Sequence, residues 1–206
     1  MKYPPSNKKG FSLIELMVSL SIFSIVMTVS IGTLLVLIDA NGKAQALSSA
    51  TTNLAFAIDS ITRNLRTGKF YHCVDSFTTG PLPEVPSSSS NLDDCDGSSG
   101  IVFTPGDQPN DRMAYRLYNN AIQQRIDIGG VGSDADWVDI TSTEPPAAVT
   151  IETFELIVSG TDGALDTADD EQANASLIIG GYVENGLEEP TRFEVQSKVT
   201  QRVLNY

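Results

Sequence analysis

The chain has 206 residues, of which 41% are hydrophobic, and it carries 26 acidic against 13 basic side chains, a formal net charge of −13. This length accommodates one long helix and one globular domain and leaves little room for a second domain. An acidic surface lacks the excess of Lys and Arg that displaces counterions from phosphates, so the composition argues against nucleic acid as a direct ligand.

The first predicted element is an apolar run over residues 11–38 that contains a single charged residue, Glu15. About 20 apolar residues suffice to cross a bilayer as a helix, so this run predicts a transmembrane helix. A carboxylate inside such a helix costs about 2.5–3.5 kcal/mol on insertion scales and normally has a functional partner. Glu15 is therefore a candidate functional residue.

The charges that flank this run predict its orientation. Lys2, Lys8 and Lys9 precede the run and Asp39 follows it. By the positive-inside bias, the short leader is expected in the cytoplasm and the rest of the chain outside. An ordinary signal anchor or a cleaved secretory signal peptide would share the lysines and the apolar run, but neither requires a glutamate five residues after a glycine.

The sequence Gly10-Phe11-Ser12-Leu13-Ile14-Glu15-Leu16, with its basic leader, resembles the processing site of type IV prepilins and type II secretion pseudopilins. The resemblance implies that a prepilin peptidase removes residues 1–10 by cutting after Gly10 and methylates the new amino group of Phe11. It also implies that Glu15 pairs with a Phe11 ammonium, its own or that of a neighbouring subunit, during filament assembly. Other pilins or pseudopilins and an inner-membrane assembly platform are the implied partners.

Residues 39–68 are predicted to form an amphipathic second half of the same helix, after a polar joint at residues 39–43. Gly68 is the expected helix stop. One apolar stripe at helical spacing is predicted on this half, formed by Leu47, Leu54, Ile58, Ile61 and Leu65.

Residues 69–100 are expected to form a long loop, because prolines and a run of four serines at 87–90 disfavour regular structure. Cys73 and Cys95 lie within it, and such a pair outside the cytoplasm favours a disulfide. Closing this loop would stabilise the fold by about 3 kcal/mol. A metal site built from the two cysteines and His72 is the alternative, but it lacks the spacing of a closed zinc site.

Residues 101–206 are expected to form an antiparallel β-sheet domain laid across the helix. Asn119 and Asn120 tolerate positive φ and lie between two alternating segments, so they predict a tight hairpin. A loop over 129–146 is expected to return to the sheet at Trp137, Val138 and Ile140. Strands are predicted at residues 101–103, 113–118, 121–126, 148–159, 177–184 and 191–204.

The predicted class is therefore α+β, a long N-terminal helix packed on an antiparallel sheet, and the order of elements is similar to the pilin fold. The 115–117 hairpin segment and the ending 195–204 resemble the larger minor pseudopilins and minor pilins of the J or W type. The aromatic residues of this part are expected in its core, namely Phe103, Tyr115, Trp137, Phe154 and Phe193.

An acidic stretch at residues 160–171 places five carboxylates and two glycines in one loop. Calcium takes six to eight oxygen ligands from such groups, although the spacing is not that of an EF-hand. Some pilins and pseudopilins hold calcium in a loop of the globular domain. Two interpretations stay open, a solvated acidic turn or a calcium site formed by Asp162, Asp166, Asp169 and Asp170.

Catalysis is not expected, because the chain has one histidine and nothing in it resembles a nucleophile elbow, a phosphate loop or a zinc motif. The predicted function is a minor pilin or pseudopilin, a structural subunit of a type IV pilus or type II secretion pseudopilus. Its precursor would be a single-pass protein of the cytoplasmic (inner) membrane with an extracytoplasmic C-terminal domain. The alternative is a membrane-anchored extracytoplasmic binding or adhesin domain, including pilus-tip adhesion or DNA uptake.

Overall fold

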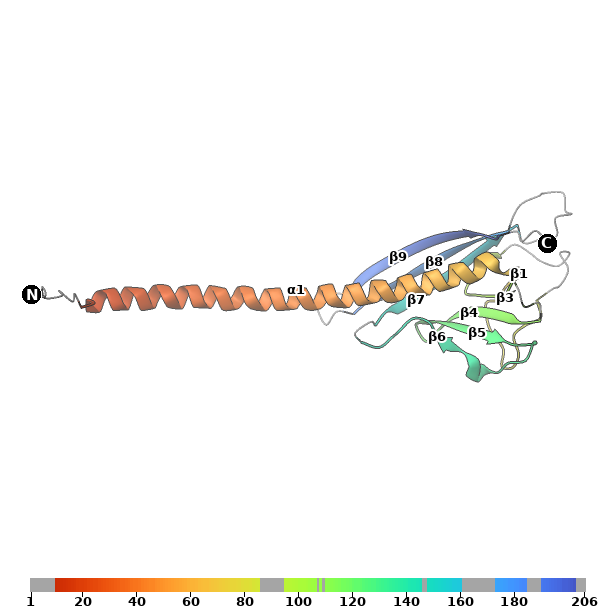
Figure 1. Cartoon of the computed structure of the whole chain (residues 1–206), viewed down its shortest axis with the longest axis horizontal. Helices are drawn as coiled ribbons and strands as arrows, with labels where there is room; N and C mark the ends of the chain where they lie inside the picture. Colours follow the sequence, from red (N-terminus) through yellow and green to blue (C-terminus); the bar gives the residue numbers. More distant parts are fainter. Residues whose placement is uncertain are drawn as a thin grey trace, which may run out of the picture. The chain divides into compact units, whose positions relative to one another are not determined.

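The computed structural model describes residues 10–85, 95–106, 108, 110–145, 148–160, 173–184 and 190–202 (Figure 1). The chain divides into two compact units, residues 1–44 and residues 45–206. The helix α1, Leu13–Thr67, contributes to both units.

In the first unit α1 is unbroken and every described side chain is exposed. The most apolar stretch of 18 residues in α1 has a mean hydropathy of 2.4 and is 0% buried. A helix of this length and composition can cross a membrane, because it satisfies its own backbone hydrogen bonds.

In the second unit one face of α1 is buried against strands. The predicted stripe is confirmed at Leu54, Ile61 and Leu65, while Ile58 is half-buried. Leu47 does not belong to the stripe, since its side chain is 46% exposed. Two small residues complete the stripe and let the strands approach the helix closely, namely Ala50 and Ala57.

The described residues of the second unit form two antiparallel sheets where the sequence predicted one. The five-stranded sheet has the order β1-β3-β4-β5-β6, formed by β1 Lys69–Cys73, β3 Gly100–Thr104, β4 Arg112–Tyr118, β5 Ala121–Asp127 and β6 Val138–Asp139. The four-stranded sheet has the order β2-β7-β8-β9, formed by β2 Cys95–Ser98, β7 Thr150–Ser159, β8 Asn174–Val183 and β9 Thr191–Thr200. A short 3₁₀ helix, η2 Asp134–Asp136, precedes β6. The predicted α+β class, a long apolar N-terminal helix with antiparallel strands, is confirmed.

The segment 69–100 differs from the predicted loop at both of its ends. β1 follows α1 after one residue, and β2 begins at Cys95. Residues 86–94, which hold most of the Ser and Pro cluster, lie outside the described residues. The loop prediction was based on the Pro and Ser residues in the middle of the segment and missed the short strands at its ends. Phe70 and Tyr71 are residue types that favour strands and could have indicated β1.

The helix ends at Thr67, directly before the predicted stop at Gly68. Close packing explains the glycine, because a Cβ at position 68 would lie 2.5 Å from Cδ2 of Phe103. The hydroxyl of Tyr71 donates to the backbone oxygens of Leu65 and Gly68, which satisfies carbonyls that the end of a helix leaves free.

The predicted hairpin at Asn119 and Asn120 is confirmed. Their φ values are 48° and 64°, and Tyr118 pairs directly with Ala121, so the loop has two residues. Positive φ at both central residues matches the twist of the flanking strands.

The core of the second unit is formed jointly by α1 and both sheets. Of the predicted aromatic core residues, Phe103, Tyr115 and Phe154 are buried, whereas Trp137 and Phe193 are half-buried. The amide of Asn64 on α1 donates to the Tyr115 hydroxyl of β4 at 2.7 Å. Fully buried aliphatic side chains come from all three layers, namely Ile61, Leu65, Ile101, Ile122, Ile151, Leu156, Leu177 and Ile179.

Candidate functional site: the processing sequence and the start of the helix

The processing sequence leads into α1 through a capped helix start. The backbone N–H of Glu15 donates to Oγ of Ser12 at 3.3 Å, and that of Leu16 donates to the carbonyl oxygen of Ser12 at 3.2 Å. Ser12 is therefore the N-cap and satisfies donors that the first turn leaves free. The Gly10–Phe11 peptide bond lies before this cap, and Phe11 is 81% exposed, so the bond is accessible to a peptidase.

Gly10 is not required by the fold of this chain. A Cβ built at position 10 meets no atom within 4 Å, and the backbone there does not adopt a left-handed conformation. A larger residue at position 10 would therefore leave the helix and its cap intact. Any requirement for glycine at this position must come from the enzyme that binds the segment.

Glu15 lies in the first turn of α1 and its side chain is exposed. The positive end of the helix dipole favours a carboxylate in this turn. Its neighbours on the surface are apolar, with Leu13 80% and Ile14 72% exposed. Among the described residues no ion pair reaches Glu15. The nitrogen of Phe11 becomes a charged amine only after cleavage, so the predicted pairing of Glu15 with Phe11 stays a prediction.

The hydroxyl side chains of the apolar run are satisfied within the helix itself. From Ser19 to Thr33 each donates to the carbonyl oxygen of the preceding turn, so these residues present no unsatisfied donor to an apolar surrounding. Five of these bonds span four residues and measure 2.7 to 2.9 Å, with Ser19, Ser21, Ser24, Thr28 and Ser30 as donors. The run can therefore sit among lipid tails or among other apolar helices without polar partners, and Glu15 remains its one ionisable group.

Cys73 of β1 and Cys95 of β2 are joined by a disulfide, with their Cα atoms 6.0 Å apart. Because β1 and β2 belong to different sheets, the bond ties one sheet to the other. Both thiols are used, so the alternative metal site with His72 is not formed. The described part of the chain contains no group of three or more His, Cys, Asp or Glu residues that could hold a metal.

The acidic loop with Asp162, Asp166, Asp169 and Asp170 lies outside the described residues. The calcium interpretation and the solvated-turn interpretation therefore both stay predictions.

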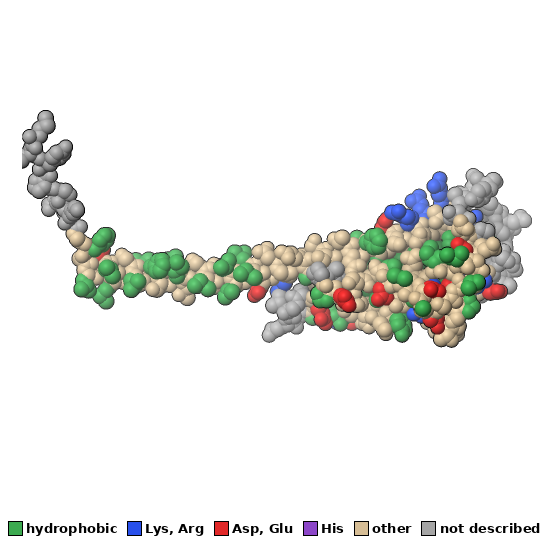
Figure 2. All heavy atoms as spheres, turned by 60° about the horizontal axis from the view of Figure 1, so that its bottom comes forward, with side chains coloured by type: hydrophobic (Ala, Val, Ile, Leu, Met, Phe, Trp, Pro, Cys, Tyr) green, Lys and Arg blue, Asp and Glu red, His purple; other side chains and the backbone are tan. Residues whose placement is uncertain are grey.

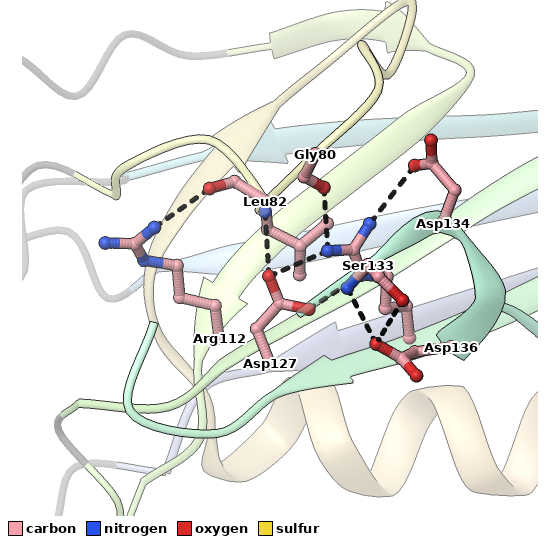
Figure 3. A network of polar contacts seen from close by, with 8 residues as sticks. Gly80, Leu82, Arg112, Asp127, Ser133, Asp134 and Asp136 are labelled. Atoms are coloured by element: carbon pink, nitrogen blue, oxygen red, sulfur yellow. Dashed lines mark hydrogen bonds and ion pairs between the residues drawn. The ribbon is translucent and has the colours of Figure 1, made fainter. Parts of the chain in front are cut away.

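A buried ion pair in β5 was not predicted from the sequence (Figure 3). Nε of Arg125 lies 2.6 Å from Oδ1 of Asp127, and both side chains are buried, at 1% and 0% exposure. Oδ2 of Asp127 accepts the backbone N–H of Leu82 at 2.8 Å, and the Arg125 guanidinium donates to the Gly80 carbonyl oxygen at 2.8 Å. The pair thus fastens the segment after β1 to β5. Because the charged groups of this pair are bonded to each other and to the backbone of this chain, we interpret the cluster as structural.

Comparison with known protein families identifies a motif at the N-terminus. The sequence profile of the prokaryotic N-terminal methylation motif matches residues 5–31. No curated protein and no solved structure matches the chain. The motif supports a type IV pilin-like class III signal, and so a precursor of the type IV pilin or pseudopilin type. It implies processing by a prepilin peptidase and assembly with pilins in the membrane, and the apolar helix fits a membrane-anchored protein of this kind.

Proposed function

We propose that this chain is a minor pilin or minor pseudopilin, a structural subunit of a type IV pilus or type II secretion pseudopilus. It enters the cytoplasmic membrane with its leader inside, is cut after Gly10, and is methylated on Phe11. The subunit then leaves the bilayer and joins a filament through the apolar half of α1. Its role is mechanical and not enzymatic.

The observation that carries this proposal is the single carboxylate of the apolar half of α1. Glu15 lies within the segment that matches the motif, and the hydroxyl side chains further along this apolar half bond to their own backbone. A buried or lipid-facing carboxylate is costly unless a cation is near. Cleavage after Gly10 creates such a cation at Phe11, and opposite charges attract strongly where water is scarce.

The test measures recruitment separately from processing. Glu15→Val is expected to be cleaved normally and to stay in the membrane fraction, with about tenfold less protein in sheared filaments, since a lost interaction of about 1.4 kcal/mol changes an equilibrium tenfold. Ile14→Val is the matched control, because this neighbour is exposed as Glu15 is but carries no charge. This variant should assemble as the wild type does. Normal incorporation of Glu15→Val would refute the assembly role of the carboxylate.

A further inference from the structure

β9 is the outer strand of its sheet and leaves one edge without a strand beside it (Figure 1). Just past its end the N–H of Arg202 donates to the carbonyl oxygen of Arg66 at 2.8 Å, so α1 closes that end of the edge. It pairs with β8 over ten consecutive residues without a register shift, from Asn174↔Thr200 to Val183↔Thr191. No other described strand pairs with β9. An open strand edge offers a row of backbone donors and acceptors to another chain.

The backbone groups that face this open edge can be assigned. The N–H of Gln201 donates to the carbonyl oxygen of Ala173 at 2.8 Å, so position 201 is hydrogen-bonded to the β8 side. In an antiparallel ladder hydrogen-bonded positions alternate, so every second residue turns its N–H and C=O away from the neighbouring strand. The outward-facing residues of β9 are therefore Arg192, Glu194, Gln196, Lys198 and Thr200, whose side chains are also exposed.

A groove of about 540 Å³ runs beside this edge, between the last turns of α1 and the end of β9. Three cations line it, Arg63, Arg66 and Lys198, against one acidic residue, Asp59. Asp59 is already paired with Arg63 at 2.8 Å. Within the described part of the chain neither Arg66 nor Lys198 has an ion-pair partner.

The groove is basic on a protein whose net charge is −13. Other cations of the second unit are engaged in the fold, for example Arg125 in its buried pair and Arg116 stacked on the Trp137 ring at 3.9 Å. In Figure 2 the Lys and Arg side chains gather mainly at one margin of the folded part, while acidic side chains are spread over the face in view. The charge of the groove is thus opposite to that of the protein as a whole.

We propose that this edge and groove bind an extended acidic segment of another polypeptide, which adds to the sheet as a strand beside β9. Backbone hydrogen bonds to the outward-facing residues would hold the segment. Its carboxylates would meet Lys198 on the exposed face of the sheet, and Arg63 and Arg66 on the helix face. This interaction is separate from assembly through the apolar half of α1 and does not depend on it.

Two other occupants fit the structure less well. A nucleic acid would use the cations but not the backbone groups of the strand edge. A second copy of this chain, joined through β9, would bring the same three cations, Arg63, Arg66 and Lys198, to both sides of the contact, where like charges repel.

The test uses the full chain in neutral detergent micelles and a fluorescent ten-residue peptide of alternating Glu and Thr. Fluorescence anisotropy is expected to show saturable binding that weakens with salt, whereas a peptide with Lys in place of Glu should not bind. Charge reversal by Arg66→Glu with Lys198→Glu should weaken binding at least tenfold. These two residues are exposed, so the double variant should keep its thermal stability.

A second variant tests the strand edge itself. Gln196→Pro removes an outward-facing N–H, and edge strands tolerate proline at such positions because the ladder to the neighbouring strand is kept. It should weaken peptide binding at least tenfold, while Gln196→Thr, which keeps the N–H, should bind as the wild type does.

Three results would overturn the proposal. The first is no binding of the acidic peptide, and the second is equal binding of the Lys peptide or of a ten-nucleotide oligo-dT. The third is a dimer in sedimentation that Gln196→Pro dissociates, since a second copy would then be the occupant.

Discussion

Replacing Asp127 by asparagine should destabilise the second unit strongly, because it removes one half of a buried ion pair. In the wild type the carboxylate of Asp127 receives the Arg125 guanidinium at 2.6 and 3.0 Å and the Leu82 N–H at 2.8 Å. The Asp127→Asn variant keeps the shape of the side chain but leaves Arg125 as a buried cation. Its remaining acidic partner is Asp134, at 3.5 Å and 47% exposed.

The expected loss is about 3–5 kcal/mol in the free energy of unfolding, the range found when one partner of a buried pair is removed. Replacing both residues by apolar ones of similar volume, Arg125→Met with Asp127→Leu, should cost much less, since no charge is then buried alone. The Leu82 N–H loses its acceptor in the double variant, so this variant is not expected to exceed the wild type.

Urea unfolding of the full chain in detergent micelles, followed by tryptophan fluorescence, measures this loss. Trp137 is the one tryptophan of the chain, and its ring centre lies 5.8 Å from the Arg125 guanidinium carbon. Asp134→Asn is the matched control and should change stability by less than about 1 kcal/mol, because pairs with an exposed partner contribute little. A free energy of unfolding for Asp127→Asn within about 1 kcal/mol of the wild type, or an equal loss in Asp134→Asn, would refute the cost assigned to the lone buried Arg125.

Two further predictions concern the junction after α1 and the bond between the sheets. Replacing Cys73 and Cys95 by serine should lower the free energy of unfolding by about 3 kcal/mol, since the disulfide closes a loop with a sequence separation of 22. Urea unfolding midpoints with and without reductant measure this loss, and an unchanged midpoint would contradict it. Phe70 has a φ of 57°, which costs a residue with a side chain about 1–2 kcal/mol. Phe70→Gly should therefore be more stable than Phe70→Ala by about 1 kcal/mol, although glycine is normally the less stable of the two residues in a strand. Thermal unfolding compares the two variants, and a less stable glycine variant would show that the backbone at position 70 is not strained.

The elements that could be predicted from the sequence are those with long or repeated local signals. The apolar run and the alternation of residues 113–126 determine a helix and a hairpin through local chemistry alone. The division into two sheets could not be predicted in this way, because it depends on which distant strands pair. Cys95 illustrates this, since β2 pairs with β7, which lies more than fifty residues further along the chain.

The processing sequence at residues 10–16 could be predicted because it is a continuous motif. Its cap could also have been predicted, since Ser12 followed three residues later by Glu15 is the usual signature of a helix start. The buried pair of Arg125 and Asp127 left only a faint signal in the sequence, two opposite charges two residues apart, with Asp127 just past the end of the predicted strand 121–126. Whether these charges are exposed or buried depends on the segment that covers them, and that segment was predicted as a loop.

The mass of the mature N-terminus decides whether this chain is processed as a prepilin-type precursor. Protein purified from membranes that contain prepilin peptidase should begin at an N-methylated Phe11, and protein from membranes without the peptidase should retain residues 1–10. Gly10→Val should block cleavage while leaving the helix intact, because a side chain at this position meets no atom of the chain within 4 Å. Retention of the leader in the presence of the peptidase, or a cut beyond the apolar run, would contradict the account.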